Sequence, residues 1–192
     1  FSIAESTLEK GQIWAGTNDG LVQVTKDGGT HWSNVTPKAK MLPARGTVGS
    51  IEPSHFDANT CYVSVDLHQV DNRNPFIFKT TDLGKSWKSI SSNLPPSPFS
   101  YVHVVKEDPY RKGLLFAGTE NAIYVSFDDG KRWQPLQSKL PHAPVSWLLI
   151  EPNFHDLVVA TYGRGFYILD DVTPLEQWSE SVKDADVHLF EP

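Results

Sequence analysis

Residues 126–133 read SFDDGKRW, and residues 25–32 (TKDGGTHW) and 80–87 (TTDLGKSW) repeat the same pattern, S/T-x-D-x-G-x-x-W. The three copies start 55 and 46 residues apart. In a tight turn between two strands, an aspartate accepts backbone N–H groups and a glycine supplies the positive φ that the reversal requires. The pattern therefore predicts structural turns, each covered by its tryptophan, at Asp27, Gly29, Trp32, Asp82, Gly84, Trp87, Asp128, Gly130 and Trp133.

Apolar, strand-like runs accompany these turns at a regular spacing. One set leads through a few polar or glycine residues into a second set, and the pairs are 13–17 with 21–24, 115–119 with 123–125, and 158–161 with 166–169. Further runs lie upstream, at 48–51, 101–105 and 145–150. Three strands before a turn and a fourth after it, in a unit of about 45–50 residues, are typical of a β-propeller blade.

The repeat predicts an all-β fold, a β-propeller fragment of about four four-stranded antiparallel blades. The blades are expected at residues 1–37, 46–93, 100–139 and 145–180, and residues 181–192 are expected to begin a linker to a following domain. The last blade lacks the Asp-Gly-Trp turn and runs through residues 170–175 instead.

Composition excludes several classes of partner. The formal net charge of −6 and the pI near 5.6 leave no basic surface for nucleic acid or anionic lipid headgroups. No apolar run approaches the roughly 18 residues of a membrane span, so no membrane insertion is expected. Cys61, the single cysteine, is predicted to be a buried structural thiol. Without a Cys/His zinc spacing or a glycine-rich phosphate loop, neither a cofactor nor a metal is predicted.

The octapeptides resemble the Asp-box (BNR) repeats of sialidases, xyloglucanases and sortilin-type receptors, which are β-propellers. More closely, the run from WAGTNDG at 14–20 to TYGRGFYILDD at 161–171 resembles exported bacterial proteins described as sortilin-like or glycosyl-hydrolase-like BNR proteins. The resemblance implies the C-terminal part of a larger propeller, in a secreted, periplasmic or cell-surface location. The remaining blades or a second copy would then be needed to close the ring.

Candidate functional residues lie in the connections between the second and third strands, which share one end of a propeller around its channel. The stretch 66–75 runs ten residues where its counterparts need three or four, and loops of extra length on a rigid scaffold are favoured sites of function. The predicted ligand-binding residues are Asp19, Asp66, His68, Asp71, Arg73, Glu120, Tyr162 and Arg164.

Three interpretations of these residues stay open. A glycosidase would use two carboxylates from Asp66, Asp71 and Glu120, with Tyr162 or Tyr101 as a platform for a sugar ring. A metal site at Asp66, His68 and Asp71 matches no established spacing. A solvated loop would instead hold its shape through ion pairs such as Asp71 with Arg73.

We favour a non-catalytic role, in which the channel-facing loops bind a glycan or an extended peptide. The alternative is a xyloglucanase-like glycoside hydrolase that acts on a polysaccharide, with Asp66 as its first candidate residue. A second alternative is a structural or assembly factor. The remaining histidines lie singly and are predicted to be surface or turn residues, His103 among them.

Overall fold

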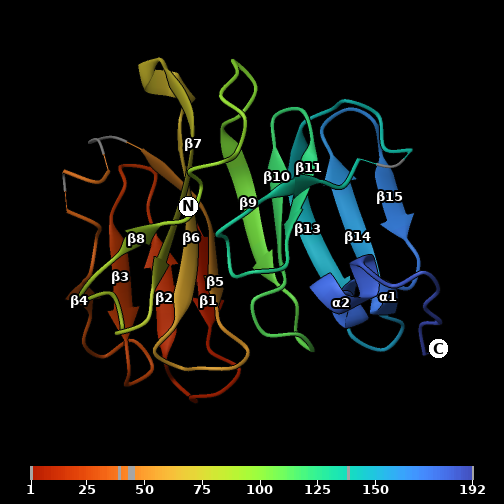
Figure 1. Ribbon diagram of the computed structural model, residues 1–192. Coiled ribbons are helices and arrows are strands. Elements are labelled where there is room, and N and C mark those ends of the chain that lie inside the picture. The colour runs from red at the N-terminus through yellow and green to blue at the C-terminus, as the bar shows by residue number, and fades with distance from the viewer. Residues whose placement is uncertain (1, 39, 43–45, 138, 192) are drawn as a thin grey trace.

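Four antiparallel sheets follow one another along the chain in the computed structural model (Figure 1), which describes residues 2–38, 40–42, 46–137 and 139–191. Phe1, the first residue of the predicted first blade, lies outside this description. Within each sheet the strand order is the chain order, as in a propeller blade. The prediction of an all-β propeller fragment with about four blades is confirmed.

The blades have the following strands. Blade 1 contains β1 (Ser2–Glu5), β2 (Ile13–Gly16), β3 (Val22–Thr25) and β4 (Ser33–Asn34). Blade 2 contains β5 (Thr47–Pro53), β6 (Cys61–Leu67), β7 (Asn72–Thr80) and β8 (Lys88–Ser89). Blade 3 contains β9 (Val102–Glu107), β10 (Leu115–Thr119), β11 (Ile123–Ser126) and β12 (Gln134–Pro135). Blade 4 contains β13 (Val145–Glu151), β14 (Asp156–Thr161) and β15 (Phe166–Leu169).

Blade 4 therefore has three strands, one fewer than its neighbours. After β15 the chain has no glycine–tryptophan turn, and Pro174 stands in the first turn of the short helix α1 (Thr173–Gln177). Proline is favoured there because its fixed φ suits a helix start. A second helix, α2 (Glu180–Lys183), follows. No helix in the described part of the chain is both long and apolar enough to cross a membrane.

The octapeptide turns fold as the sequence predicts. In blade 2 the Thr80 hydroxyl donates to Asp82 at 2.8 Å and accepts the N–H of Gly84 at 2.8 Å, while Asp82 accepts the N–H of Ser86 at 2.9 Å. The hydroxyl of Ser86, its backbone N–H and the hydroxyl of Thr80 together hold the pKa of the Asp82 carboxyl below its usual range. The equivalent bonds recur around Asp27 and Asp128, so all three aspartates bond within their own turns.

The tryptophans do more than cover their own turns. The indole N–H of Trp87 donates to the Val35 carbonyl of blade 1 at 2.6 Å, and that of Trp133 donates to the Ile90 carbonyl of blade 2 at 2.7 Å. We call this the Trp–carbonyl contact. Trp32, in the first blade, bonds to Gly29 of its own turn at 3.0 Å and is 40% exposed. The octapeptide tryptophans of blades 2 and 3 are thus each bonded to the preceding blade.

The glycine of the turn lets the preceding blade come close. Gly84 has φ +77°, and a Cβ there would lie 2.5 Å from the Val35 Cβ. Gly130 has φ +78°, and its Cβ would lie 2.7 Å from the Ile90 Cδ1. Both the backbone conformation and the close approach exclude a larger residue.

The core consists of three apolar layers, one between each pair of successive blades. Layer 1/2 contains Trp14, Val24 and Val48 and receives Trp87. The layers 2/3 and 3/4 are centred on two further groups of buried residues, which are Tyr62, Ile77, Ile90, Val102 and Trp133 for layer 2/3, and Phe116, Ile123, Leu148, Leu157 and Val159 for layer 3/4. Cys61 is fully buried in layer 1/2, as predicted for a structural thiol.

Layer 2/3 also buries polar groups. Glu107, 1% exposed, accepts the phenol of Tyr62 at 3.0 Å and the backbone N–H of His55 at 2.9 Å. Burial, with the negative charges of Glu107 and Asp129, raises the pKa of Tyr62 far above its usual range. Blade 2 is therefore joined to blade 3 by hydrogen bonds as well as by apolar packing.

Both ends of the row of blades present apolar side chains. Trp147, Leu149, Phe166 and Ile168 are 45–77% exposed and share the face of blade 4 that has no following blade. Ile3, on blade 1, is 74% exposed. An exposed apolar face such as that of blade 4 marks an interaction surface, so this end fits an incomplete ring.

The segment after β15 is fastened to blades 3 and 4. The Val172 N–H donates to the His155 carbonyl at 2.7 Å, and the Arg111 guanidinium donates to the Leu175 carbonyl at 2.5 Å. The His155 ring lies 2.8 Å from a Glu176 oxygen, which raises the pKa of His155.

The turn glycines give a matched pair of variants. Gly84→Ala should lower the free energy of unfolding by about 2–4 kcal/mol, because it combines left-handed strain with a clash against Val35. Gly28→Ala, at φ +69° with nothing within 4 Å of the added Cβ, should cost only about 1 kcal/mol. Urea unfolding measures both, and equal costs would contradict a close approach of the blades at Gly84.

The His155–Glu176 pair predicts a pH dependence. Because the folded pKa of His155 is raised above the ordinary 6.5, its stabilisation is fully present below pH 6.5 and is lost as the pH rises through the raised pKa. His155→Gln should therefore lower the Tm at about pH 5.5 and have less effect at about pH 8.5. A Tm difference that stays constant over this range would contradict the pair's role.

Candidate functional site

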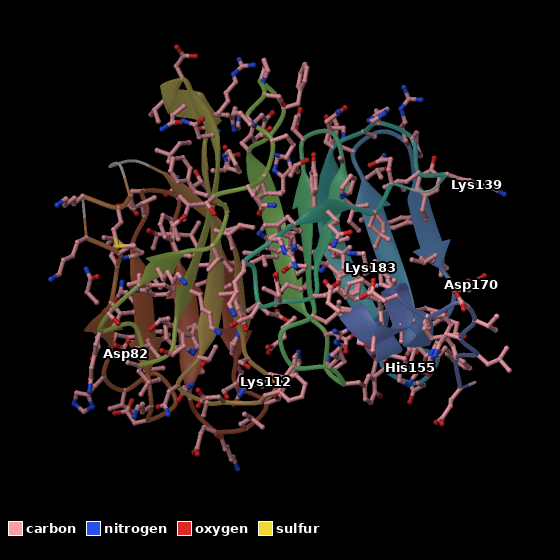
Figure 2. All side chains as sticks on the ribbon, in the orientation of Figure 1. Asp82, Lys112, Lys139, His155, Asp170 and Lys183 are labelled. Carbon is pink, nitrogen blue, oxygen red and sulfur yellow. The ribbon has the colours of Figure 1, made fainter. Side chains whose placement is uncertain are left out.

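The connections between second and third strands lie at one end of the sheets, the upper end in Figure 1, where the β6–β7 hairpin projects beyond the other blades. The Asp-box turns lie at the opposite end, and Figure 2 shows Asp82 there. The structure therefore separates the turns that build the blades from the residues predicted to bind a ligand.

The stretch 66–75 is not a ten-residue loop, which corrects the sequence-based expectation. β6 continues to Leu67 and β7 begins at Asn72, so only residues 68–71 connect them, as the 3-10 turn His68–Val70 closed by Asp71 at φ 61°. The strands are longer than the sequence suggests because Leu67 pairs with Asn72 beyond a register shift near Val65.

Asp66 and His68 contact each other at the base of this hairpin. Asp66 accepts the backbone N–H of His68 at 2.8 Å, and the ring Nδ1 lies 2.7 and 2.8 Å from its two oxygens. An ionised carboxylate only accepts hydrogen bonds, so Nδ1 carries the proton. In the neutral ring, Nε2 is then left as an acceptor for another molecule.

Blade 3 continues the contact network. The Tyr101 ring stacks on His68 with centroids 4.8 Å apart and meets His103 edge-on at 5.2 Å. His103 Nε2 lies 2.9 Å from a Glu120 oxygen. Burial, the hydrogen bond to Glu120 and its charge raise the pKa of Tyr101 to about 12. We call Asp66, His68, Tyr101, His103 and Glu120 the channel-end cluster.

The cluster is accessible to solvent at its polar groups. The side chains of His68, His103 and Glu120 are 39%, 24% and 26% exposed, whereas that of Asp66 is 12% exposed. It therefore presents imidazole and carboxylate groups from two blades around a largely buried tyrosine.

The structure brings together some of the residues expected from sequence. Asp66, His68 and Glu120 join the cluster, whereas Arg73 is exposed on β7. Asp71 lies exposed at the hairpin turn, and Asp19 accepts the hydroxyl of its neighbour Thr17.

Blade 4 contributes Tyr162 and Arg164, which are exposed in the turn 162–165. Within the described residues they make no hydrogen bond or ion pair with the cluster. No group of three or more His, Cys, Asp or Glu side chains in the described part of the chain could hold a metal ion.

Sequence reasoning missed His103, which was expected at the surface or in a turn, and it treated Tyr101 only as a platform. His103 lies in β9, the first strand of blade 3, and Tyr101 directly precedes that strand. The available signal was the place of His103 inside the apolar run 101–105. Its partner Glu120, 17 residues away, could not be read from spacing.

Comparison with known proteins identifies one family whose model matches more than half of the chain. The family model Sortilin-Vps10, described as sortilin, neurotensin receptor 3, matches residues 20–149. A search of curated proteins returned no match.

Three solved structures are similar in fold. The structure of YCF48 bound to D1 peptide has 22% identity and a TM-score of 0.63, covering 90% of this chain and 52% of that one. An ancestral GH74 enzyme has 20% identity and a TM-score of 0.67, with 87% and 25% covered. The extracellular domain of BT4673 from B. thetaiotaomicron has 18% identity and a TM-score of 0.62, with 90% and 21% covered. This chain thus spans about half of YCF48 and about a quarter of the larger proteins.

The Asp66–His68 contact predicts a tautomer. Neutral His68 should carry its proton on Nδ1, because Asp66 faces that nitrogen, and Asp66→Ala should remove the preference. Long-range ¹H–¹⁵N spectra of the imidazole distinguish the two forms. An unchanged tautomer population in the variant would show that Asp66 does not orient the ring.

Proposed function

Because this chain belongs to the Sortilin-Vps10 family, we propose that it is a recognition propeller that binds an extended ligand, a peptide or a glycan, through its channel-end cluster without catalysing a reaction. The observation that carries this proposal is the contact network from Asp66 on blade 2 to Glu120 on blade 3. A ligand that crosses the boundary between these blades would contact both.

The chemistry of the cluster suits binding. His68 offers Nε2, Glu120 offers a partly exposed carboxylate, and Arg73 is exposed on β7. Peptides and glycans both carry alternating donors and acceptors that such groups can bond, and ordered polar groups lose little entropy on binding. Asp19, Asp71, Tyr162 and Arg164, exposed at the same end, would extend the surface.

The contacts of the carboxylates in the cluster support glycoside hydrolysis less well than binding. A glycoside hydrolase needs one carboxylic acid free to protonate the leaving oxygen and a second carboxylate free to act on the sugar or on water. Here Asp66 accepts from the ring and backbone of His68, and Glu120 contacts His103. Both carboxylates already have imidazole partners, and Asp71 is at the turn.

The proposal also covers how the ring is completed and where the protein is located. The exposed apolar face of blade 4 and the partial coverage of larger propellers support a ring completed by further blades or by a second copy. A secreted, periplasmic or cell-surface location accords with BT4673, whose matched part is an extracellular domain.

The proposal is tested with a random dodecapeptide library and with xyloglucan oligosaccharides as probes. Probes selected by the wild-type protein should bind Glu120→Gln and His103→Ala about tenfold or more weakly, because each variant breaks the imidazole–carboxylate contact. Lys112→Ala, at the opposite end of the molecule (Figure 2), is the matched control and should bind as the wild type does. Calorimetry measures these affinities.

Two results would overturn the proposal. Release of reducing sugar from xyloglucan that Asp66→Asn abolishes, with the fold intact, would make the protein a hydrolase. Probe binding that survives unchanged in the Asp66→Asn, Arg164→Ala double variant would place the ligand elsewhere and favour a structural or assembly role.

A further inference from the structure

Two lysines of blade 2 stand where blades 1 and 3 have uncharged side chains. Lys79 on β7, directly before its octapeptide, and Lys88 on β8 are opposite each other, so both point to the face of the sheet that packs on blade 3. The equivalent pairs are Val24 with Ser33 in blade 1 and Val125 with Gln134 in blade 3. Like charges opposite each other on neighbouring strands destabilise a sheet. The repeat therefore gives no structural reason for two lysines here.

Blade 3 supplies a carboxylate for only part of this charge. Lys79 Nζ contacts Asp129, whose other oxygen accepts the phenol of Tyr62 at 2.9 Å. The turn itself does not need this carboxylate, because a glycine and a leucine stand at the same place in the other two octapeptides. Lys88 and Lys131 are both exposed and form no ion pair within the described residues. Two ammonium groups are thus left without a counter-charge.

These residues line a groove between β8 and the octapeptide turn of blade 3, which we call the lysine groove. Its volume of about 470 Å³ is within the range of small-ligand sites. The polar side chains that line it are those of Lys79, Lys88, Lys131, Asp129, Thr81, Ser86, Ser89 and Ser92. Three ammonium groups and one carboxylate give the groove a positive charge, although the chain has a net charge of −6.

The position of the lysine groove separates it from the channel-end cluster. Thr81 and Ser86 flank Asp82, which Figure 2 labels at the end of the sheets opposite that cluster. The two sites share no residue. Because the lysine groove lies between blades 2 and 3, its walls are complete whatever closes the ring.

The lining of the groove suits an acidic saccharide. Lysine ammonium groups form charge-assisted hydrogen bonds with carboxylate or sulfate groups, and serine and threonine hydroxyls donate to and accept from the hydroxyls of a sugar ring. The lysine stems, with Ile90, add apolar surface for the ring carbons. An acidic peptide fits less well, because extended peptides gain affinity by pairing with a strand edge and β8 has only two residues.

We propose that the lysine groove binds an acidic saccharide, with a carboxylate or sulfate group on Lys88 and Lys131 and ring hydroxyls on the surrounding serines and Thr81. This is a second binding site, and it does not rest on the function proposed for the channel-end cluster.

Two probes distinguish the sources of the anionic group. Trigalacturonate carries carboxylates, and the κ-carrageenan tetrasaccharide carries sulfates. Calorimetry in about 20 mM NaCl should show saturable binding of at least one probe, and about 500 mM NaCl should weaken it because salt screens exposed charges. The uncharged forms, trigalacturonate trimethyl ester and the desulfated tetrasaccharide, should bind about tenfold or more weakly than their charged parents.

Protein variants locate the binding. Lys88→Gln and Lys131→Gln should each weaken it about tenfold without lowering the Tm, since both side chains are exposed. Lys26→Gln, which removes an exposed lysine from the octapeptide of blade 1, is the matched control and should bind as the wild type does. Asp129→Asn keeps an acceptor for Tyr62 and frees Lys79 for the ligand, so it should strengthen binding several-fold.

Four outcomes would overturn the proposal. The first is no binding of either saccharide at about millimolar concentration, a range in which even weak complexes form. The second is equal binding of the charged and uncharged forms. The third is a loss in Lys88→Gln and Lys131→Gln no larger than in Lys26→Gln. The fourth is tighter binding of hexaglutamate than of either saccharide, which would assign the lysine groove to an acidic peptide.

Discussion

The Trp–carbonyl contact is the interaction on which the arrangement of the blades depends. It joins a turn in one sheet to the backbone of the sheet before it, across 52 residues for Trp87 and 43 for Trp133. The glycine two residues after the aspartate makes the approach possible, because no Cβ stands between Gly84 and Val35. The aspartate holds the shape of the turn, the glycine allows the turn to approach the preceding blade, and the indole N–H bonds to the backbone of that blade.

The close approach of blade 3 to blade 2 determines which residues meet in the channel-end cluster. Asp66 and His68 belong to blade 2, and Tyr101, His103 and Glu120 belong to blade 3, so their contacts exist only because the two sheets are held in register. Hydrogen bonds near the channel support the same boundary, since Ser64 Oγ donates to the His103 carbonyl at 3.0 Å. The cluster thus combines outer contacts that space the blades with inner contacts that align their first strands.

The sequence predicted the blades well because their turns repeat a local pattern whose chemistry lies within eight residues. It did not predict the partners of Trp87 and Trp133, which lie in other blades, or the contact of His103 with Glu120. It also misjudged residues 66–75, where β-pairing overrode a polar composition that suggested a loop. Asp66, His68 and Glu120 could be named as candidates because the end of the blade on which they lie is readable from the strand order, whereas which side chains meet depends on the angle between two sheets.

The third layer has a consequence for cooperativity. Each blade contacts only its neighbours along the row, so the stability of the array is close to a sum of blade and interface contributions. In the described chain the boundary before blade 4 lacks the indole bond, and the donors across it are Tyr110 and Arg111, which bond to the Pro152 and Leu175 carbonyls at 2.6 and 2.5 Å. Sub-global opening separates cooperative units at the boundaries between them. The attachment of blade 4 therefore depends on one loop of blade 3, whereas blades 1 to 3 are joined through their octapeptide turns.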